Sequence, residues 1–96
     1  MSAYCFADIL KINDSDKFEA YRDRVFANVE RHGGRYLAVG GQVNRVEGDW
    51  QPTFPVIIEF PSLQQALDWY NSDDYAELKA LRLAAAETNA VFIEGI

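Results

Sequence analysis

Residues 55–62 read PVIIEFPS, and the interpretation of the whole chain starts from this stretch. Four apolar residues surround a single carboxylate, Glu59, in a run too short for a helix and without strict alternation, which is typical of a strand buried on both faces. Pro55 is tolerated only at the first position of such a strand. Pro61 then ends it. The stretch therefore predicts a short, buried strand that contains one charge.

A broken helix is expected directly after this strand. Ser62 and Gln65 have the spacing of a capping box, in which a serine and a glutamine satisfy the first amide groups of a helix. Asn71 and Ser72 interrupt the helical pattern, and Ser72 is suited to cap a second helical segment. The apolar residues that define the two segments are Leu63, Ala66, Leu67 and Tyr70, then Tyr75, Leu78, Leu81 and Ala85.

Upstream, residues 35–39 predict a second strand, which meets two adjacent glycines, Gly40 and Gly41. Paired glycines inside an extended pattern indicate a bulge or sharp bend. The extended pattern resumes over residues 42–47, and residues 48–52 have the composition of a turn. We expect one long, bent strand or a tight hairpin here.

The N-terminal segment, residues 4–12, alternates with apolar residues on both faces and predicts a central strand. Residues 15–32 predict a helix, capped by Asn13 or Asp14 and ended by Gly33-Gly34. Residues 91–93 predict the last strand. The order β-α-β-β-α-β predicts a ferredoxin-like α+β sandwich with an antiparallel sheet, built as one domain over residues 1–96. Since the strands are apolar on both faces, we expect the second sheet face to be covered.

Composition excludes several functional classes. The chain has 96 residues and a net charge of −6, which opposes binding to nucleic acid and to anionic membranes. Its single cysteine, Cys5, cannot form an internal disulfide, and its single histidine, His32, leaves no metal-ligand cluster. No export signal or membrane span is visible, so we expect a cytoplasmic protein.

The order of several short motifs resembles domain of unknown function family 1330, of the dimeric α/β barrel superfamily, and the match runs nearly end to end. These motifs are Gly33-Gly34-Arg35-Tyr36-Leu37 with Gly40-Gly41, Glu47-Gly48-Asp49-Trp50 with Pro52, Glu59-Phe60-Pro61-Ser62, Ala66 with Trp69-Tyr70-Asn71-Ser72, Tyr75, Arg82, and Glu94-Gly95.

This resemblance implies a homodimer whose two sheets face one another, with a cavity between each sheet and its helices or along the dimer seam. It implies no particular reaction, because the superfamily includes cofactor-free monooxygenases, isomerases, haem proteins and binding proteins. A haem is disfavoured, since His32 is the only histidine. Thr53-Phe54 departs from the family, which often has a basic residue before this strand, and this departure argues against an anion site at the turn.

Glu59 is the first candidate catalytic residue, because a carboxylate in an apolar strand must be paired or protonated. One reading is a structural ion pair with Arg35, Arg45 or Arg82. The other is a general acid or base with a raised pKa.

Asp8 and His32 are the other catalytic candidates. Asp8 lies on the strand expected beside that of Glu59. Two neighbouring carboxylates on the same sheet face would have different pKa values, as a general acid and a general base require. His32 suits proton transfer, but a histidine in the last turn of a helix also interacts favourably with the helix dipole.

Candidate ligand-binding residues are Arg35, Trp69, Tyr70, Tyr75 and Arg82. The arginines would hold a carboxylate or enolate, and the aromatic residues would line a pocket. Core packing explains the tyrosines equally well. Trp69 is two positions from Leu67, so we expect it to point away from the main apolar stripe, toward a groove or partner. Trp50, in a turn, is expected to make a dimer or lid contact.

Two hypotheses follow. The first is a cofactor-free enzyme acting on a small apolar or aromatic molecule, with Glu59, His32 or Asp8 moving a proton. The second is a dimeric binding or interaction module without catalysis, in which the polar residues pair internally and aromatic residues fill the barrel. No cofactor and no metal are expected under either hypothesis.

Overall fold

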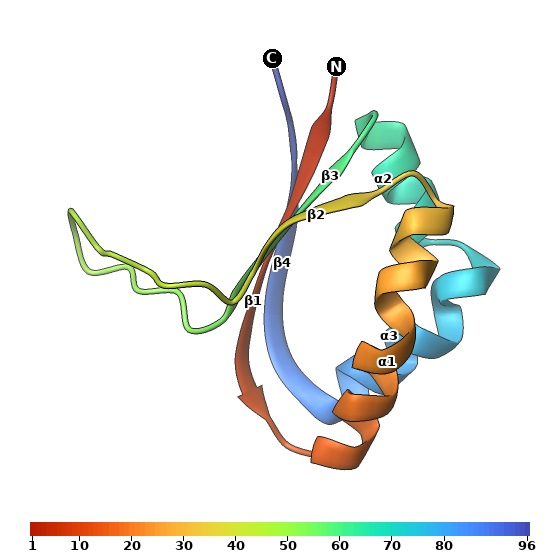
Figure 1. Cartoon of the computed structure of the whole chain (residues 1–96), viewed down its shortest axis with the longest axis horizontal. Coiled ribbons are helices and arrows are strands. Elements are labelled where there is room, and N and C mark those ends of the chain that lie inside the picture. Colours follow the sequence, from red (N-terminus) through yellow and green to blue (C-terminus); the bar gives the residue numbers. More distant parts are fainter.

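The structure, a computed structural model, describes residues 1–96. A four-stranded antiparallel sheet in the order β2-β3-β1-β4 carries three helices on one face, as Figure 1 shows. This is the expected ferredoxin-like α+β arrangement, with the second helix in two pieces. The elements are β1 (Ala3–Ile12), α1 (Ser15–Arg31), β2 (Arg35–Val39), β3 (Pro55–Phe60), α2 (Leu63–Tyr70), α3 (Asp73–Ala85) and β4 (Ala86–Glu94).

Strand β1 lies in the middle of the sheet, between β3 and β4, as its two apolar faces predicted. Residues directly opposite one another in an antiparallel pair point to the same face. Ala3 and Cys5 are buried against the helices, so Tyr4, which is paired with Glu59 on β3 and Ile93 on β4, points to the opposite face. This register decides which candidates can meet, because only one face carries the helices.

The helix ends follow from the capping residues in the sequence. The side chain of Asp14 accepts the amide proton of Lys17 at the start of α1. Gly33, at φ +85°, ends it in the left-handed conformation that favours glycine. Ser62 caps α2 and Ser72 caps α3, which confirms the predicted break in the second helix.

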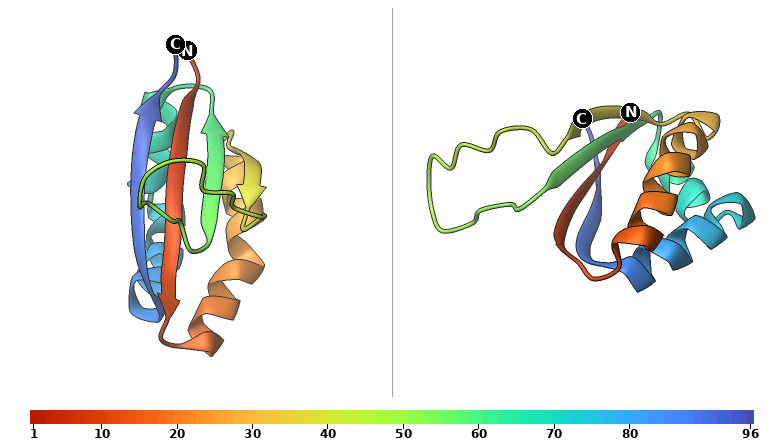
Figure 2. Two further views of the ribbon diagram at one scale, coloured as in Figure 1. Left: turned by 90° about the vertical axis from the view of Figure 1, so that its left-hand side faces the viewer. Right: turned by 60° about the horizontal axis from the view of Figure 1, so that its bottom comes forward.

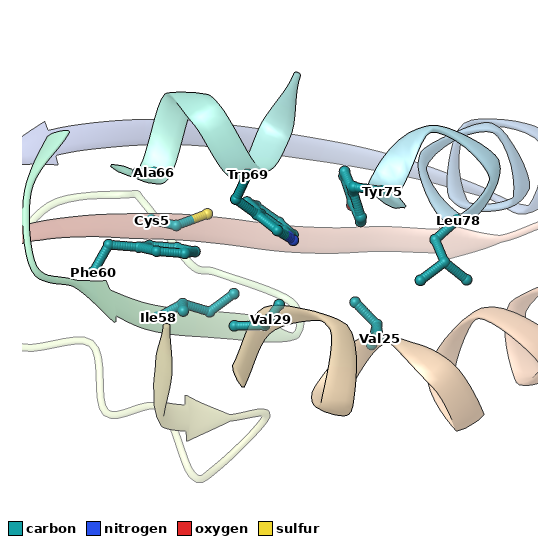
Figure 3. Packing of buried hydrophobic residues seen from close by; sticks show 9 residues of the cluster. All are labelled: Cys5, Val25, Val29, Ile58, Phe60, Ala66, Trp69, Tyr75 and Leu78. Carbon is teal, nitrogen blue, oxygen red and sulfur yellow. The ribbon is translucent and has the colours of Figure 1, made fainter. Parts of the chain in front are cut away.

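Between the sheet and helices, the half of the layer nearest α2 is densely packed. We call this half the packed end, formed by Phe60, Trp69, Val29, Ala66 and Ile58, and Figure 3 shows these side chains pointing toward one another from strand and helix. The ring centroids of Phe60 and Trp69 are 5.4 Å apart. Trp69 is 3% exposed, so the expectation that it points away from the apolar stripe is wrong. The spacing from Leu67 misled because Leu67 is itself exposed, whereas Ala66, three residues before Trp69 and therefore on the same helix face, is buried.

The expected extended segment over residues 42–47 is also wrong. Strand β2 ends at Val39, and residues 40–54 contain no strand. They form an arm that projects from the body, as Figure 1 and the right-hand view of Figure 2 show. Gly40 starts it at φ +75°, where an added Cβ would lie 2.4 Å from the ring of Phe54. A side chain there would therefore block the base of the arm. The β-bulge instead falls between Tyr36 and Ala38.

The sheet face away from the helices is left uncovered within one chain. Val91 and Ile93 of β4 are more than half exposed there. Trp50 of the arm remains 68% exposed while its ring packs 5.7 Å from that of Phe6 on the same face. In addition, no helix combines the length and apolar character needed to cross a membrane.

Candidate functional site

A cavity of about 490 Å³ lies between the sheet and the helices, next to the packed end, whose Ile58 and Trp69 form part of its lining. It extends from there into the other half of the layer. We call this half the open end. Of its 24 lining residues, 19 are hydrophobic, and they come from the sheet as well as from α1, α2 and α3. The cavity therefore occupies one of the two places that the family resemblance implied, between a sheet and its own helices.

Small residues on the sheet create the space. Ala7 of β1 and Ala90 of β4 are directly paired in the register, and both line the cavity. Two residues away along the strands, on the same sheet face and toward the packed end, the partners are Cys5 and Phe92. The side chain of Phe92 fills volume there, and its ring lies 5.8 Å from that of Tyr70. The two paired alanines have no large side chain to fill the layer at the open end.

An aromatic cluster forms the wall between the packed end and the cavity. Trp69, at the end of α2, lies 4.2 Å from the ring of Tyr75 and 6.2 Å from that of Tyr70, and Figure 3 shows Trp69 beside Tyr75. The indole N–H of Trp69 donates to Oδ1 of Asn28 at 2.8 Å, which fixes the ring. The helix break at Ser72 makes this cluster possible, because it turns Tyr75 back toward Trp69.

Arg82 of α3 is the charged group inside the site. It is 9% exposed, and its Nε donates to the hydroxyl of Tyr75 at 3.4 Å. Its Nη1 donates to Oγ1 of Thr88, and the Tyr75 hydroxyl shares a hydrogen bond of 3.1 Å with that of Tyr21. A chain of polar groups from α1, α3 and β4 thus lies along one wall of an otherwise apolar cavity.

The protonation states of these groups follow from their surroundings. Burial raises the pKa of the Tyr21 hydroxyl, with Tyr75 adding to the effect, so the hydroxyl stays protonated at neutral pH. Burial alone would lower the pKa of Arg82, but the oxygens of Tyr75 and Tyr21 favour its charged form and the pKa is raised. Burial raises the pKa of the Cys5 thiol to about 11, which keeps it protonated and unreactive. The site is therefore rich in donors and lacks a built-in base.

Glu59 lies on the uncovered sheet face and not in the cavity. Its carboxylate accepts from Nη2 of Arg35 at 2.7 Å and from the hydroxyl of Tyr4 at 3.3 Å. The Arg35 hydrogen bond holds the pKa of Glu59 below its usual range. Of the three arginines predicted as possible partners of Glu59, Arg35 is the one that pairs with it. Glu59 is therefore ionised at neutral pH.

Asp8 points to the same sheet face as Glu59, but its carboxylate binds the backbone of the arm. Its carboxylate accepts the amide protons of Thr53 and Phe54 at 2.8–3.1 Å, where the arm returns to the sheet. Asp8 is paired with Pro55 and Tyr4 with Glu59, so the two carboxylates are four positions apart along β1. At about 3.3 Å per residue, that separation is about 13 Å. The structure does not bring them together.

His32 stands at the C-terminal end of α1, where its Nε2 lies 3.0 Å from Oδ2 of Asp74. Arg31 and the buried Asn28 bind the same carboxylate. The hydrogen bond from His32, with that from Arg31, holds the pKa of Asp74 below its usual range. This cluster joins the end of α1 to the start of α3 and lies apart from the cavity lining.

The predicted ligand residues divide between the two faces. Trp69, Tyr70, Tyr75 and Arg82 all line the cavity, whereas Arg35 does not. Sequence reasoning missed Tyr21 and Thr88, which complete the polar wall. Tyr21 was visible only as part of the apolar stripe of a helix, while Thr88 lay before the predicted last strand, which actually begins at Ala86. No group of three or more metal-binding side chains is present.

Comparisons with known proteins identify the fold. The family profile of the domain of unknown function DUF1330 matches residues 2–96. None of the curated proteins matches the chain. A solved protein of unknown function from Rhodopseudomonas palustris is 17% identical with a TM-score of 0.76, over 99% of this chain and 82% of that one.

Two further solved structures bear on assembly and chemistry. A dimeric protein of unknown function with a ferredoxin-like fold, from Bacteroides fragilis, is 14% identical with a TM-score of 0.58, over 98% of this chain and 96% of that one. SnoaB, a cofactor-independent oxygenase from Streptomyces nogalater, is 10% identical with a TM-score of 0.59, over 99% of this chain and 91% of that one. At such identities the likeness concerns the fold alone.

Proposed function

Because the chain belongs to the DUF1330 family of domains of unknown function, we propose a function from its cavity: it binds a small, largely apolar or aromatic molecule between the helices and the sheet. The observation that carries this proposal is the 490 Å³ volume with its mainly hydrophobic lining. Ligand pockets commonly have volumes of about 300–1,000 Å³ and a few placed polar groups.

A second candidate function is cofactor-free conversion of the bound molecule. The donor groups of Tyr21, Tyr75 and Arg82 beside an apolar space favour it, since such donors stabilise negative charge that develops on an enolate or phenolate. The fold likeness to a cofactor-independent oxygenase adds support. Proton transfer by Glu59, His32 or Asp8 stays a prediction, and none of the three lines the cavity.

We further propose that a second copy of the chain covers the uncovered sheet face, so that the protein is a homodimer. The exposed side chains of Val91, Ile93 and Trp50 supply apolar surface on that side. The fold likeness to a dimeric protein agrees with this proposal. We place the dimer in the cytosol, whose reducing conditions suit its one cysteine.

Native mass spectrometry of protein purified from its own host tests the ligand. We expect a retained small molecule in the wild type and in Ala27→Leu, whose site is exposed on α1. We expect its loss in Ala90→Leu, which extends a larger side chain from the sheet into the cavity. Retention of the molecule by folded Ala90→Leu would contradict the proposed cavity. Turnover of the identified molecule by the purified protein would separate an enzyme from a binding module.

The same spectra test the dimer. We expect Val91→Lys with Ile93→Lys to yield monomers, because two buried lysines would lose their hydration without gaining partners. Leu83→Lys is the matched control, since Leu83 is 62% exposed on α3, in the helix layer. Dimers that persist in the double variant would contradict pairing through this face.

A further inference from the structure

All the charged residues that line the cavity are basic. Three charged residues line the cavity, Lys11, Arg22 and Arg82, and all are basic, while no aspartate or glutamate lines it. The whole chain has the opposite balance, with 15 acidic and 9 basic residues. Arg22 has a carboxylate neighbour at the surface, Glu19 at 3.7 Å. Arg82, the buried one, forms no ion pair within the chain.

An arginine in this position is unusual because a buried charge normally has a counter-ion. By contrast, Arg35 of β2 is mostly exposed and yet has Glu59 at 2.7 Å. Arg82 has only hydroxyl oxygens, from Tyr75 and Thr88. Its cationic charge is therefore solvated by neutral dipoles and lacks an anion.

The guanidinium also keeps a free donor. Arg82 uses Nε and Nη1 for its two hydrogen bonds, and Nη2 makes none. No fully buried side-chain nitrogen or oxygen in the molecule lacks a partner. Nη2 is therefore not sealed in the protein, and since Arg82 lines the cavity, its N–H groups are available there.

The neighbouring hydroxyls add a second donor. Tyr21 and Tyr75 have two hydroxyl protons but share one hydrogen bond, and neither hydroxyl donates to any other protein group. Whichever tyrosine donates, one proton is left without a protein acceptor. The polar wall thus offers two kinds of unsatisfied donor, an arginine N–H and a tyrosine O–H, and no free carboxylate to receive them.

We propose that the cavity takes a ligand with an apolar or aromatic body and one carboxylate, and that the carboxylate binds Nη2 of Arg82 and the free hydroxyl of the Tyr21–Tyr75 pair. An ionised carboxylate is an acceptor with no proton to donate, which matches a wall of donors. Arginine binds carboxylates through directed, charge-assisted hydrogen bonds. This inference rests on the proposed ligand-binding function and specifies its chemical class.

Calorimetric titration of the wild-type protein with 2-naphthoate and 2-naphthamide tests the inference. The two probes share an apolar body and differ in charge. We expect naphthoate to bind about tenfold to a hundredfold more tightly, the effect of a hydrogen bond to a charged group. Equal affinities for both probes would overturn the carboxylate assignment while leaving the binding function intact. If neither probe binds, the proposed binding function fails as well.

Variants locate the effect. Arg82→Gln is expected to reduce naphthoate affinity to that of naphthamide, with naphthamide affinity unchanged, and Tyr21→Phe to weaken naphthoate binding by a smaller factor. Arg24→Gln, at an exposed arginine that pairs with Glu77 outside the cavity, changes the net charge equally and is expected to bind as the wild type does. An equal loss in Arg24→Gln would show a general charge effect and overturn the role of Arg82. If Arg82→Gln does not fold, Tyr21→Phe and the two-probe comparison decide.

Discussion

The packed end and the open end lie on the same face of the same sheet and under the same helices, yet one is filled and the other is hollow. At the packed end, Phe60 is fully buried against Trp69 and Val29. At the open end, the paired alanines Ala7 and Ala90 face a cavity bordered by a buried cation. The fold does not require the cavity, because the same layers close over large side chains a few residues away.

The comparison teaches which part of the molecule provides stability and which is available for binding. Burial of apolar surface is the main source of folding free energy, so the packed end should contribute most of it. The open end keeps an unfilled volume and an unpaired arginine, both of which reduce stability. The following predictions test this division of roles.

The largest expected effect is the truncation of a side chain at the packed end. Phe60→Ala should lower the free energy of unfolding by about 3–5 kcal/mol, because it removes a fully buried ring and leaves a cavity. Phe18→Ala, at a partly exposed cavity-lining residue, should lower it by less than about 2 kcal/mol. Urea unfolding followed by far-ultraviolet circular dichroism measures both. Equal losses would mean that the two ends do not differ.

Adding atoms should also distinguish the two ends, because a larger side chain should destabilise the packed end and not the open end. An added Cβ at Gly34 would lie 2.5 Å from Cγ1 of Val29 and 2.9 Å from the ring of Phe60. Gly34→Ala should therefore lower the free energy of unfolding by about 1–3 kcal/mol, the usual cost of overpacking. Ala90→Leu should leave it unchanged or higher, since it enters empty space. A similar loss in both variants would contradict an unfilled open end.

A smaller effect is expected on the pH dependence of stability under acidic conditions. The folded pKa of Asp74 is held below its unfolded value by His32 and Arg31, so its contribution is present above the unfolded pKa, about 3.9, and is lost as pH falls through the folded value. Asp74→Asn should therefore flatten the fall in the urea midpoint between about pH 5 and pH 2. Asp23→Asn, at an exposed residue that forms no ion pair, serves as the reference. An unchanged slope would show that this cluster does not stabilise the contact of α1 with α3.

The smallest effect is expected on the uncovered sheet face. Glu59→Gln removes the ion pair with Arg35, which is 73% exposed, and such exposed pairs contribute little to stability. Naphthoate affinity should also stay unchanged, because Glu59 does not line the cavity. The same unfolding and titration experiments measure both quantities. Loss of binding or of turnover in a folded Glu59→Gln protein would instead support the predicted role of Glu59 in catalysis.

Much of the fold was predictable because it depends on local signals. Ser62 and Ser72 each precede a helical pattern and cap the helix that follows. Gly33 ends a helix because glycine adopts positive φ at little cost. The arm over residues 40–54 was not predictable in this way. Residues 42–47 were expected to continue the strand, but no neighbouring strand pairs with them, and extended backbone without a partner is not a sheet.

The candidate site divides in the same way. The sequence by itself determined that Glu59 needed a partner, that Trp69, Tyr70, Tyr75 and Arg82 belonged to one broken helix, and that the chain was acidic, because these properties belong to residue types and their spacing. Only the tertiary structure decided that Glu59 meets Arg35 on one face while Arg82 lies without a carboxylate beside a cavity on the other. Strand register assigns residues to faces, and shifting it by one residue reverses the assignment.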